Sequence, residues 1–117
     1  MVTKYPKVVA YDFDKTVTLG FKPGIYIPKQ KIKDKPNREV VDFLKKCRKE
    51  GFKVICHTSR WYGDYNSIKE WLDKHNVPYD DIILGNFKAD VYLNDLAVNP
   101  LNSDWKERFH EILKMKG

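Results

Sequence analysis

Two aspartates separated by a single residue are the pair in this sequence best suited to chemistry. Asp12 and Asp14 directly follow a short apolar run, Lys7–Tyr11, which is typical of a buried strand. Carboxylates this close together can share a hard divalent cation, and Mg²⁺ prefers few carboxylates with water and phosphate oxygens. One of them can attack phosphorus while the other gives a proton to the leaving oxygen. The same spacing also occurs in plain turns at strand ends.

Three further polar clusters follow predicted strands. Thr58 offers a hydroxyl beside exposed backbone amides, a good donor to a phosphate oxygen, although a helix cap is the alternative. Lys88 lies between two predicted strands and can neutralise charge on phosphoryl oxygens, or it is an ordinary surface lysine. Asn94 and Asp95 follow the apolar run Val91–Leu93 and would complete a metal site, or form a turn.

Strands and helices alternate along the chain. The predicted strands are Lys7–Tyr11, Phe52–Cys56, Ile82–Leu84 and Val91–Leu93. One helix opens at Pro36-Asn37 and ends at Gly51, a second carries Ile68, Trp71, Leu72 and His75 on one face, and a third is capped by Ser103 and buries Trp105, Phe109, Ile112 and Leu113. This order predicts a three-layer α/β/α, Rossmann-like fold with a mostly parallel sheet and helices on both faces. Ligands of such sheets bind beyond the carboxyl ends of the strands, where all four polar clusters are expected.

Length and composition favour one cytoplasmic domain. The 117 residues are enough for a single core, so residues 1–117 are expected to form one domain. Cys47 and Cys56 occupy apolar positions and are expected to be buried core residues rather than a disulfide or a metal pair. No apolar stretch approaches the ~20 residues that span a bilayer, so we expect no membrane partner.

The formal charge of +6 is concentrated in the first half of the chain. Residues 1–60 hold 15 Lys and Arg against 6 Asp and Glu. The excess is densest in a flap predicted at residues 17–35, which contains Lys22, Lys29, Lys31, Lys33 and Lys35. Such a basic stripe can attract a phosphorylated or polyanionic ligand, or it can simply keep a loop solvated.

In chain order, the runs VVAYDFDKT, VICHTSR, NFKAD and VYLND resemble the four motifs of the haloacid-dehalogenase-like (HAD) phosphatase superfamily. The resemblance implies a Mg²⁺-dependent phosphomonoesterase in which Asp12 is the nucleophile that forms an aspartyl-phosphate. It implies that Asp14 protonates the leaving group and then activates water, and that Thr58 and Lys88 complete the catalytic set. Thr16 resembles the structural threonine of the first motif.

The resemblance also implies two sets of ligand-binding residues. Phosphate binding is expected at Phe13, Thr58, Ser59 and Lys88, and metal binding at Asp12, Asp14, Asn94 and Asp95. The fourth motif commonly holds two aspartates, so Asn94 is a departure, and it leaves open whether Asn94 or Asp95 contacts the metal. Lys15 stands where glycine is frequent.

The spacing between the motifs leaves no room for the cap domain that covers many HAD sites. A capless site suits a large substrate or a homo-oligomer in which a neighbour closes the crevice. Trp61, Tyr62 and Tyr65 follow the second motif and can stack on a base or sugar, or anchor the start of a helix. The expected substrate is a sugar phosphate, a nucleotide or a phosphorylated polymer end. Small HAD proteins of capsular polysaccharide or sugar-phosphate metabolism have a similar pattern from Thr58 onward.

Two other functions stay open. A catalytically weak HAD-like protein would bind nucleic acid or a protein partner through the basic flap. Asn94 favours this alternative, while Asp12 and Asp14 oppose it. A phosphotransferase or mutase would pass the phosphoryl group to another acceptor than water. Zinc-ligand spacing and the Gly-rich loops of P-loop and dinucleotide-binding proteins are absent from the sequence.

Overall fold

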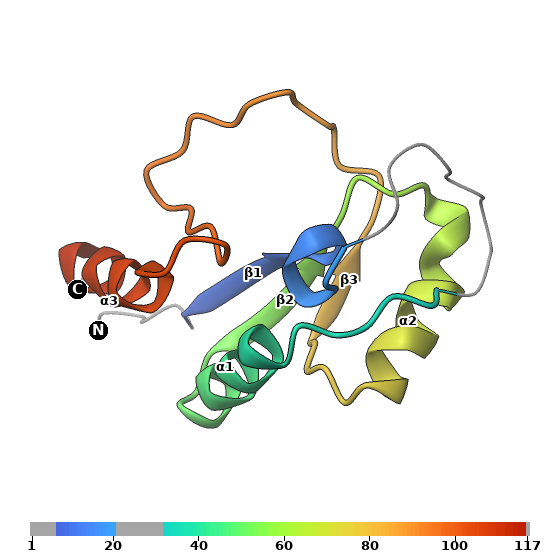
Figure 1. Cartoon of the computed structure of the whole chain (residues 1–117), viewed down its shortest axis with the longest axis horizontal. Coiled ribbons are helices and arrows are strands. Elements are labelled where there is room, and N and C mark those ends of the chain that lie inside the picture. The colour runs from blue at the N-terminus through green and yellow to red at the C-terminus, as the bar shows by residue number, and fades with distance from the viewer. Residues whose placement is uncertain (1–6, 21–31, 117) are drawn as a thin grey trace, which may run out of the picture.

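A computed structural model describes residues 7–20 and 32–116, with side chains as far as Lys114. Its sheet has three parallel strands, β1 (Val8–Asp12), β2 (Lys53–His57) and β3 (Asp81–Ile83), in the order β1-β2-β3. Three helices, α1 (Arg38–Lys49), α2 (Tyr65–Lys74) and α3 (Trp105–Lys116), lie between and after the strands (Figure 1). The chain therefore has the α/β fold with a parallel sheet that its alternating pattern predicts.

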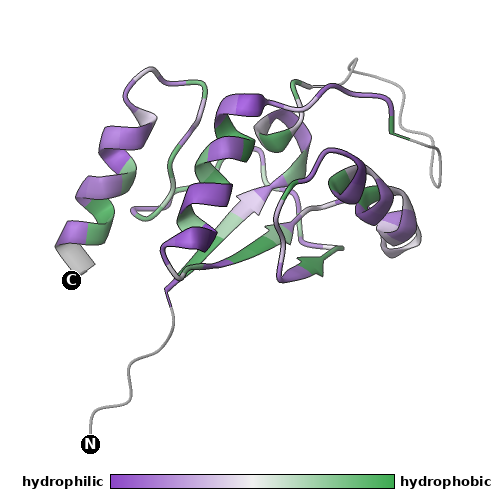
Figure 2. Ribbon diagram, turned by 90° about the horizontal axis from the view of Figure 1, so that it is seen from below, coloured by the Kyte–Doolittle hydropathy of each residue, from purple (hydrophilic) through white to green (hydrophobic). Residues whose placement is uncertain are grey.

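The core lies on one face of the sheet. The β1–β2 register places Tyr11 opposite Cys56, and both side chains are buried together with Val54. The amphipathic pattern of α1 and α2 directs their apolar residues onto this face. All three helices lie on the same side of the sheet in Figure 2. The core cluster consists of Tyr11, Phe13, Val17, Val40, Val41, Leu44, Cys47, Phe52, Val54, Cys56, Ile68, Trp71, Leu72, Val77, Ile82, Leu84 and Trp105.

The opposite face of the sheet is more open. Val8 and Ile83, which belong to this face, are 51% and 43% exposed. The second helical layer expected here is not found among residues 7–20 and 32–116, so the three-layer arrangement is not confirmed.

An irregular turn, η1 (Phe13–Val17), follows β1. Its last residue, Val17, is hydrogen-bonded to the chain that follows the flap. Phe13 and Val17 are fully buried, and the Phe13 ring meets Trp71 of α2 edge-on at 5.2 Å between ring centroids. The Asn37 amide donates to the Val17 carbonyl at 2.6 Å, next to an isolated bridge between Thr18 and Pro36. Residues 21–31 of the predicted flap, with Lys22, Lys29 and Lys31, lie outside the described residues, whereas Lys33 and Lys35 are exposed.

The fourth strand predicted at Val91–Leu93 is wrong in this structure. The segment lies in a long loop that arches away from the sheet between β3 and α3 (Figure 1). Val91 is 74% and Leu93 98% exposed, and the hydrogen bonds of this stretch are local, such as Leu96 N–H to Asn94 Oδ1 at 2.8 Å. A run of three apolar residues forms a strand only where a neighbouring strand takes up its backbone groups, and no strand of the described residues does so.

The C-terminal helix packs on α1 through aromatic side chains. Phe43 meets both Trp105 and Phe109 edge-on at 4.8 Å between ring centroids, and Lys106 pairs with Glu39 at 3.4 Å. Among the helices of the described part of the chain, none has the length and apolar character needed to cross a bilayer.

Candidate active site

Asp12 and Thr58 lie side by side at the carboxyl ends of two adjacent strands. Asp12 is the last residue of β1 and pairs in register with His57, the last residue of β2, so Thr58 follows directly at the same edge. The Phe13 amide donates to Asp12 Oδ1 at 2.7 Å, which fixes the start of η1. Thr58 is buried, whereas the Asp12 side chain is exposed to solvent.

The environment raises the pKa of Asp12 above its ordinary value of 3.8. The surrounding chain displaces water from the carboxyl group, and this desolvation is the largest cause. The carboxylate of Asp14 acts in the same direction, while the Phe13 amide and His57 oppose the shift. The edge of the sheet therefore holds a carboxylate that is accessible and incompletely hydrated, as a nucleophile requires.

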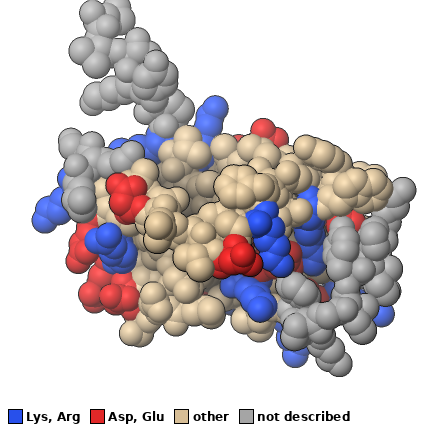
Figure 3. Space-filling model, turned by 90° about the horizontal axis from the view of Figure 1, so that it is seen from above, with Lys and Arg blue, Asp and Glu red and all other residues tan. Residues whose placement is uncertain are grey.

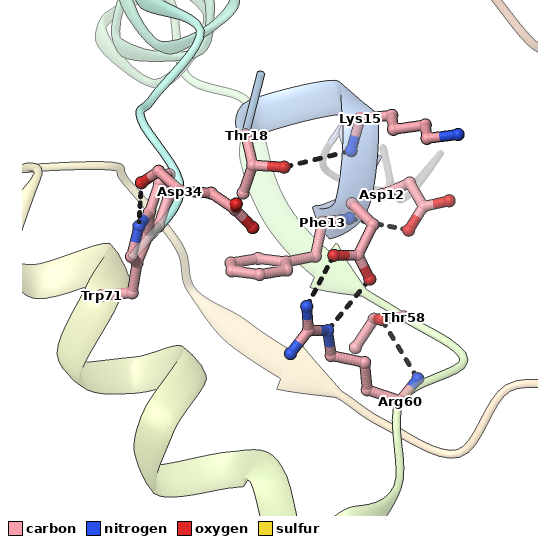
Figure 4. Close-up of polar contacts among 9 residues, drawn as sticks. Asp12, Phe13, Lys15, Thr18, Asp34, Thr58, Arg60 and Trp71 are labelled. Atoms are coloured by element: carbon pink, nitrogen blue, oxygen red, sulfur yellow. Dashed lines mark hydrogen bonds and ion pairs between the residues drawn. The ribbon is translucent and has the colours of Figure 1, made fainter. Parts of the chain in front are cut away.

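A bidentate ion pair holds the second aspartate. Arg60 Nε donates to Asp14 Oδ2 at 2.9 Å and Nη2 donates to Oδ1 at 2.8 Å (Figure 4). The two side chains are only 15% and 22% exposed, so solvent screens the pair weakly. Asp14 and Arg60 are thus fixed relative to each other beside Asp12.

Arg60 itself is held from three directions. Its guanidinium lies over the Phe13 ring at 5.3 Å, its backbone amide donates to Thr58 Oγ1 at 3.2 Å, and its carbonyl accepts from the Gly85 amide at 2.8 Å. The sequence analysis assigned no role to this arginine. Its place two residues after Thr58, at the expected phosphate edge, is a signal that the sequence offers but that the sequence analysis did not use.

Asp34 is a third carboxylate near the pair, and the sequence analysis also missed it. The Trp71 indole donates to the Asp34 carbonyl at 2.9 Å and so anchors the end of the flap on α2 (Figure 4). The pKa of Asp34 is raised, first by desolvation and then by the charge of Asp14, against the attraction of Arg60. No local pattern singles out this aspartate, because only the docking of the flap on α2 brings it to the site.

The remaining predicted site residues lie in two different regions of the structure. Ser59 is exposed and lies beside Thr58, whereas Lys88, Asn94 and Asp95 are exposed residues of the long loop. Within residues 7–20 and 32–116, no three His, Cys, Asp or Glu side chains form a group that could hold a metal ion. The structure thus brings Asp12, Phe13, Asp14, Thr58 and Ser59 together with Arg60, while the roles of Lys88, Asn94 and Asp95 stay predictions.

On one face of the molecule the charged side chains of the described residues are scattered rather than continuous. The face seen from above is largely uncharged, and its Lys and Arg side chains adjoin Asp and Glu side chains (Figure 3). This arrangement differs from the continuous basic surface that non-specific nucleic-acid binding uses.

Comparison with known proteins places the chain among α/β folds. Neither a protein-family model nor a curated protein matches it. The crystal structure of an MCSG target from Vibrio cholerae is similar, with a TM-score of 0.72 and 27% identity over 95% of this chain and 99% of that chain. A chain in the structure of the Pnkp1/Rnl/Hen1 complex is similar at a TM-score of 0.64 and 26% identity, over 94% of this chain and 36% of that one. The chain thus spans the whole length of the first neighbour but about a third of the second.

Proposed function

We propose that this chain is a Mg²⁺-dependent phosphomonoesterase that works through an aspartyl-phosphate on Asp12. The observation that carries the proposal is the placement of an accessible carboxylate and a buried hydroxyl, Asp12 and Thr58, at the ends of adjacent parallel strands. Ligands of parallel α/β sheets bind at this edge. The arginine-held carboxylate of Asp14 beside Asp12 adds the second group that such a reaction needs.

The proposed reaction has two displacements at phosphorus. An Asp12 carboxylate oxygen bonds to phosphorus as the ester P–O bond breaks, and the leaving oxygen takes a proton from Asp14. Water then gives a proton to Asp14 and bonds to phosphorus, which breaks the aspartyl P–O bond, frees Asp12 and releases inorganic phosphate. Thr58 Oγ1 is placed to donate to a phosphoryl oxygen. For the first transfer, the pair between Asp14 and Arg60 has to open and Asp14 has to take up a proton from solvent.

The donor chemistry of the site fits Mg²⁺. This ion keeps several waters and is usually bound by one or two carboxylates together with phosphate oxygens of the substrate. Asp12 supplies one exposed carboxylate, and the backbone carbonyl of Asp14 is the second donor that we propose. Since Arg60 occupies the Asp14 carboxylate, Asp95 is the candidate for a further ligand. Mg²⁺ bound there would neutralise charge on the phosphoryl oxygens.

We extend the proposal to the fold and suggest a HAD-like, three-layer arrangement without a cap domain. The parallel order β1-β2-β3, with Asp12 and Thr58 at the carboxyl ends of adjacent strands, supports it.

The function is tested by phosphate release from an aryl phosphate with and without Mg²⁺. We expect turnover that needs Mg²⁺ and that disappears in Asp12→Asn. Asp42→Asn makes the same chemical change at an exposed position of α1 and serves as the matched control, with activity unchanged. Equal activity of Asp12→Asn and wild type would refute a nucleophilic role for Asp12.

One observation favours the catalytically weak alternative, namely that Lys88, Asn94 and Asp95 are exposed residues of the long loop and not of strand ends. A titration with single-stranded DNA at two salt concentrations separates the two functions. A binding module loses affinity steeply as salt rises, whereas a phosphatase for small substrates shows little affinity at either concentration.

A further inference from the structure

Three strand ends form a line across the candidate site. The register pairs Asp12 with His57 and His57 with Ile83, so the three strands end at the same level. Adjacent strands lie about 4.8 Å apart, which places the exit of β3 about 10 Å from Asp12. Along this line lie Asp12 at β1, then Thr58 and Arg60 after β2, and Gly85 just beyond β3.

The exit of β3 is fastened to the loop after β2. The Gly85 amide donates to the Arg60 carbonyl at 2.8 Å, and the Asn86 amide donates to the Thr58 carbonyl at 3.2 Å. Asn86 Nδ2 also lies 3.2 Å from His57 Nδ1. The far end of the line is therefore fixed relative to the residues that would bind phosphate.

An aromatic ring covers this far end. The Tyr62 ring lies on Gly85 so closely that a Cβ there would be 2.6 Å from Tyr62 Cζ. Gly85 also has φ +75°, a conformation that side chains other than glycine rarely adopt. Tyr62 is nevertheless 69% exposed, so much of the ring is open to a ligand.

Trp61 adds a second aromatic surface beside Tyr62. Its ring rests against Gly63, and the residue is 52% exposed. Both rings are thus seated on glycines, Tyr62 on Gly85 beyond β3 and Trp61 on Gly63 in the segment after β2. Exposed apolar side chains that are neighbours, unlike single scattered ones, are typical of binding surfaces.

We propose that Tyr62, with Trp61, forms the subsite for the leaving group and that this subsite takes the base of a nucleoside monophosphate. The inference rests on the proposed function, because it assumes that phosphorus is attacked at Asp12. Every nucleobase offers a flat π-face for stacking, which the ring of a simple sugar phosphate lacks. In a nucleotide the pentose separates the base from the phosphate. Asp12 and Tyr62 are separated by two strand spacings, so a ligand that reaches both needs such a spacer.

The experiment measures binding in the Asp12→Asn background, where no turnover interferes. Adenosine 3′-monophosphate, adenosine 5′-monophosphate and ribose 5-phosphate are titrated by calorimetry in the presence of Mg²⁺. We expect the tighter nucleotide to bind at least about tenfold better than ribose 5-phosphate, as one stacked base predicts. Adding Tyr62→Ser should remove that advantage and leave ribose 5-phosphate nearly unchanged. Adding Tyr62→Phe keeps the ring and should keep the advantage.

Two results would overturn the subsite. One is equal affinity for the nucleotides and ribose 5-phosphate, and the other is a Tyr62→Ser change that weakens all three ligands alike. Turnover of the aryl phosphate by wild type is measured separately. If this turnover depends on Asp12 while the nucleotide advantage is missing, the subsite fails and the proposed function stands. If the advantage is present without any turnover, the proposed function fails.

Discussion

The carboxylate of Asp14 is fixed by two short hydrogen bonds from one guanidinium. Because both side chains are largely buried, each would lose a charged partner in a place that water reaches poorly if the other were removed. This ion pair joins η1 to the loop after β2. It therefore orders the candidate site and also contributes to the stability of the fold.

A double-mutant cycle with Asp14→Asn and Arg60→Met measures that contribution. We expect a coupling free energy of about 1–3 kcal/mol, as for charge-assisted bidentate pairs in partly buried positions. Arg60→Lys keeps the positive charge but cannot donate two parallel hydrogen bonds to the carboxylate, so it should retain only part of the coupling free energy. Urea unfolding of wild type, the single variants and the double variants gives the values. Single effects that add within about 0.5 kcal/mol would show that the pair is not coupled.

The ionised Asp12 side chain lowers the free energy of unfolding, whereas a neutral asparagine at this position would not. Its pKa is raised in the folded chain, so the native state holds the proton more tightly than the unfolded state does. The contribution of Asp12 to stability should therefore fall as pH rises from 3.8 through the raised pKa. We expect Asp12→Asn to melt at a higher temperature than wild type near neutral pH, and the difference to shrink at about pH 4.

Thermal unfolding of both proteins across this pH range gives the comparison, and Asp42→Asn again controls for the loss of one negative charge. A difference that grows on acidification would mean that the carboxyl group is stabilised as an anion, contrary to the direction stated here.

At the scale of elements, η1 depends on one residue with an unusual backbone. Lys15 has φ 58°, in the left-handed region, where a side chain costs about 1–2 kcal/mol relative to glycine. The turn accepts this cost because it buries Phe13 and Val17 on either side. Glycine is frequent at this position in the motif that the sequence resembles, and the φ angle gives the physical reason.

Lys15→Gly should stabilise the chain by up to about 1 kcal/mol, because the relief of strain exceeds the entropy that glycine adds to the unfolded state. Lys15→Ala removes the lysine side chain but keeps the strain, and serves as the control with little gain. Chemical denaturation measures both variants. Equal stability of the glycine and alanine variants would contradict the strain at this position.

The elements that the sequence predicts correctly are those whose own pattern identifies them. Helix α1 has its apolar residues at helical spacing between an Asn cap and a glycine, and the strands around Val54 and Ile82 are continuous apolar runs. The run Val91–Leu93 has the same composition, but a strand of that length is decided by its neighbour. Local periodicity predicts which residues will be buried, but it does not predict which element they will pack against.

In the candidate site too, the sequence predicts the residues that local patterns identify and misses those that depend on tertiary contacts. The sequence identifies Asp12, Asp14 and Thr58 because each directly follows a recognisable strand, and parallel pairing then brings the strand ends together. Arg60 and Asp34 acquire their roles only through tertiary contacts, the first by reaching back to Asp14 and the second by docking on Trp71. No spacing rule within the sequence encodes either contact.

At the scale of the whole molecule, two cysteines report on the opening of the core. Cys47 lies in α1 and Cys56 in β2, and both are buried in the same hydrophobic cluster, as the sequence predicts. Burial raises the pKa of the Cys47 thiol to about 11 and that of Cys56 to about 12. Their helix and strand pack against each other, so both thiols should become reachable only when the shared core opens.

We therefore expect neither thiol to react with a disulfide reagent in the native protein at about pH 8, because the raised pKa keeps the reactive thiolate scarce and burial keeps it inaccessible. In rising urea, both thiols should become reactive along the same curve that reports unfolding by tryptophan fluorescence. Cys47→Ala and Cys56→Ala assign the signal to each thiol. If Cys47 reacts at urea concentrations where Cys56 is still protected, α1 separates from the sheet before the strands part, and the core is not a single cooperative unit.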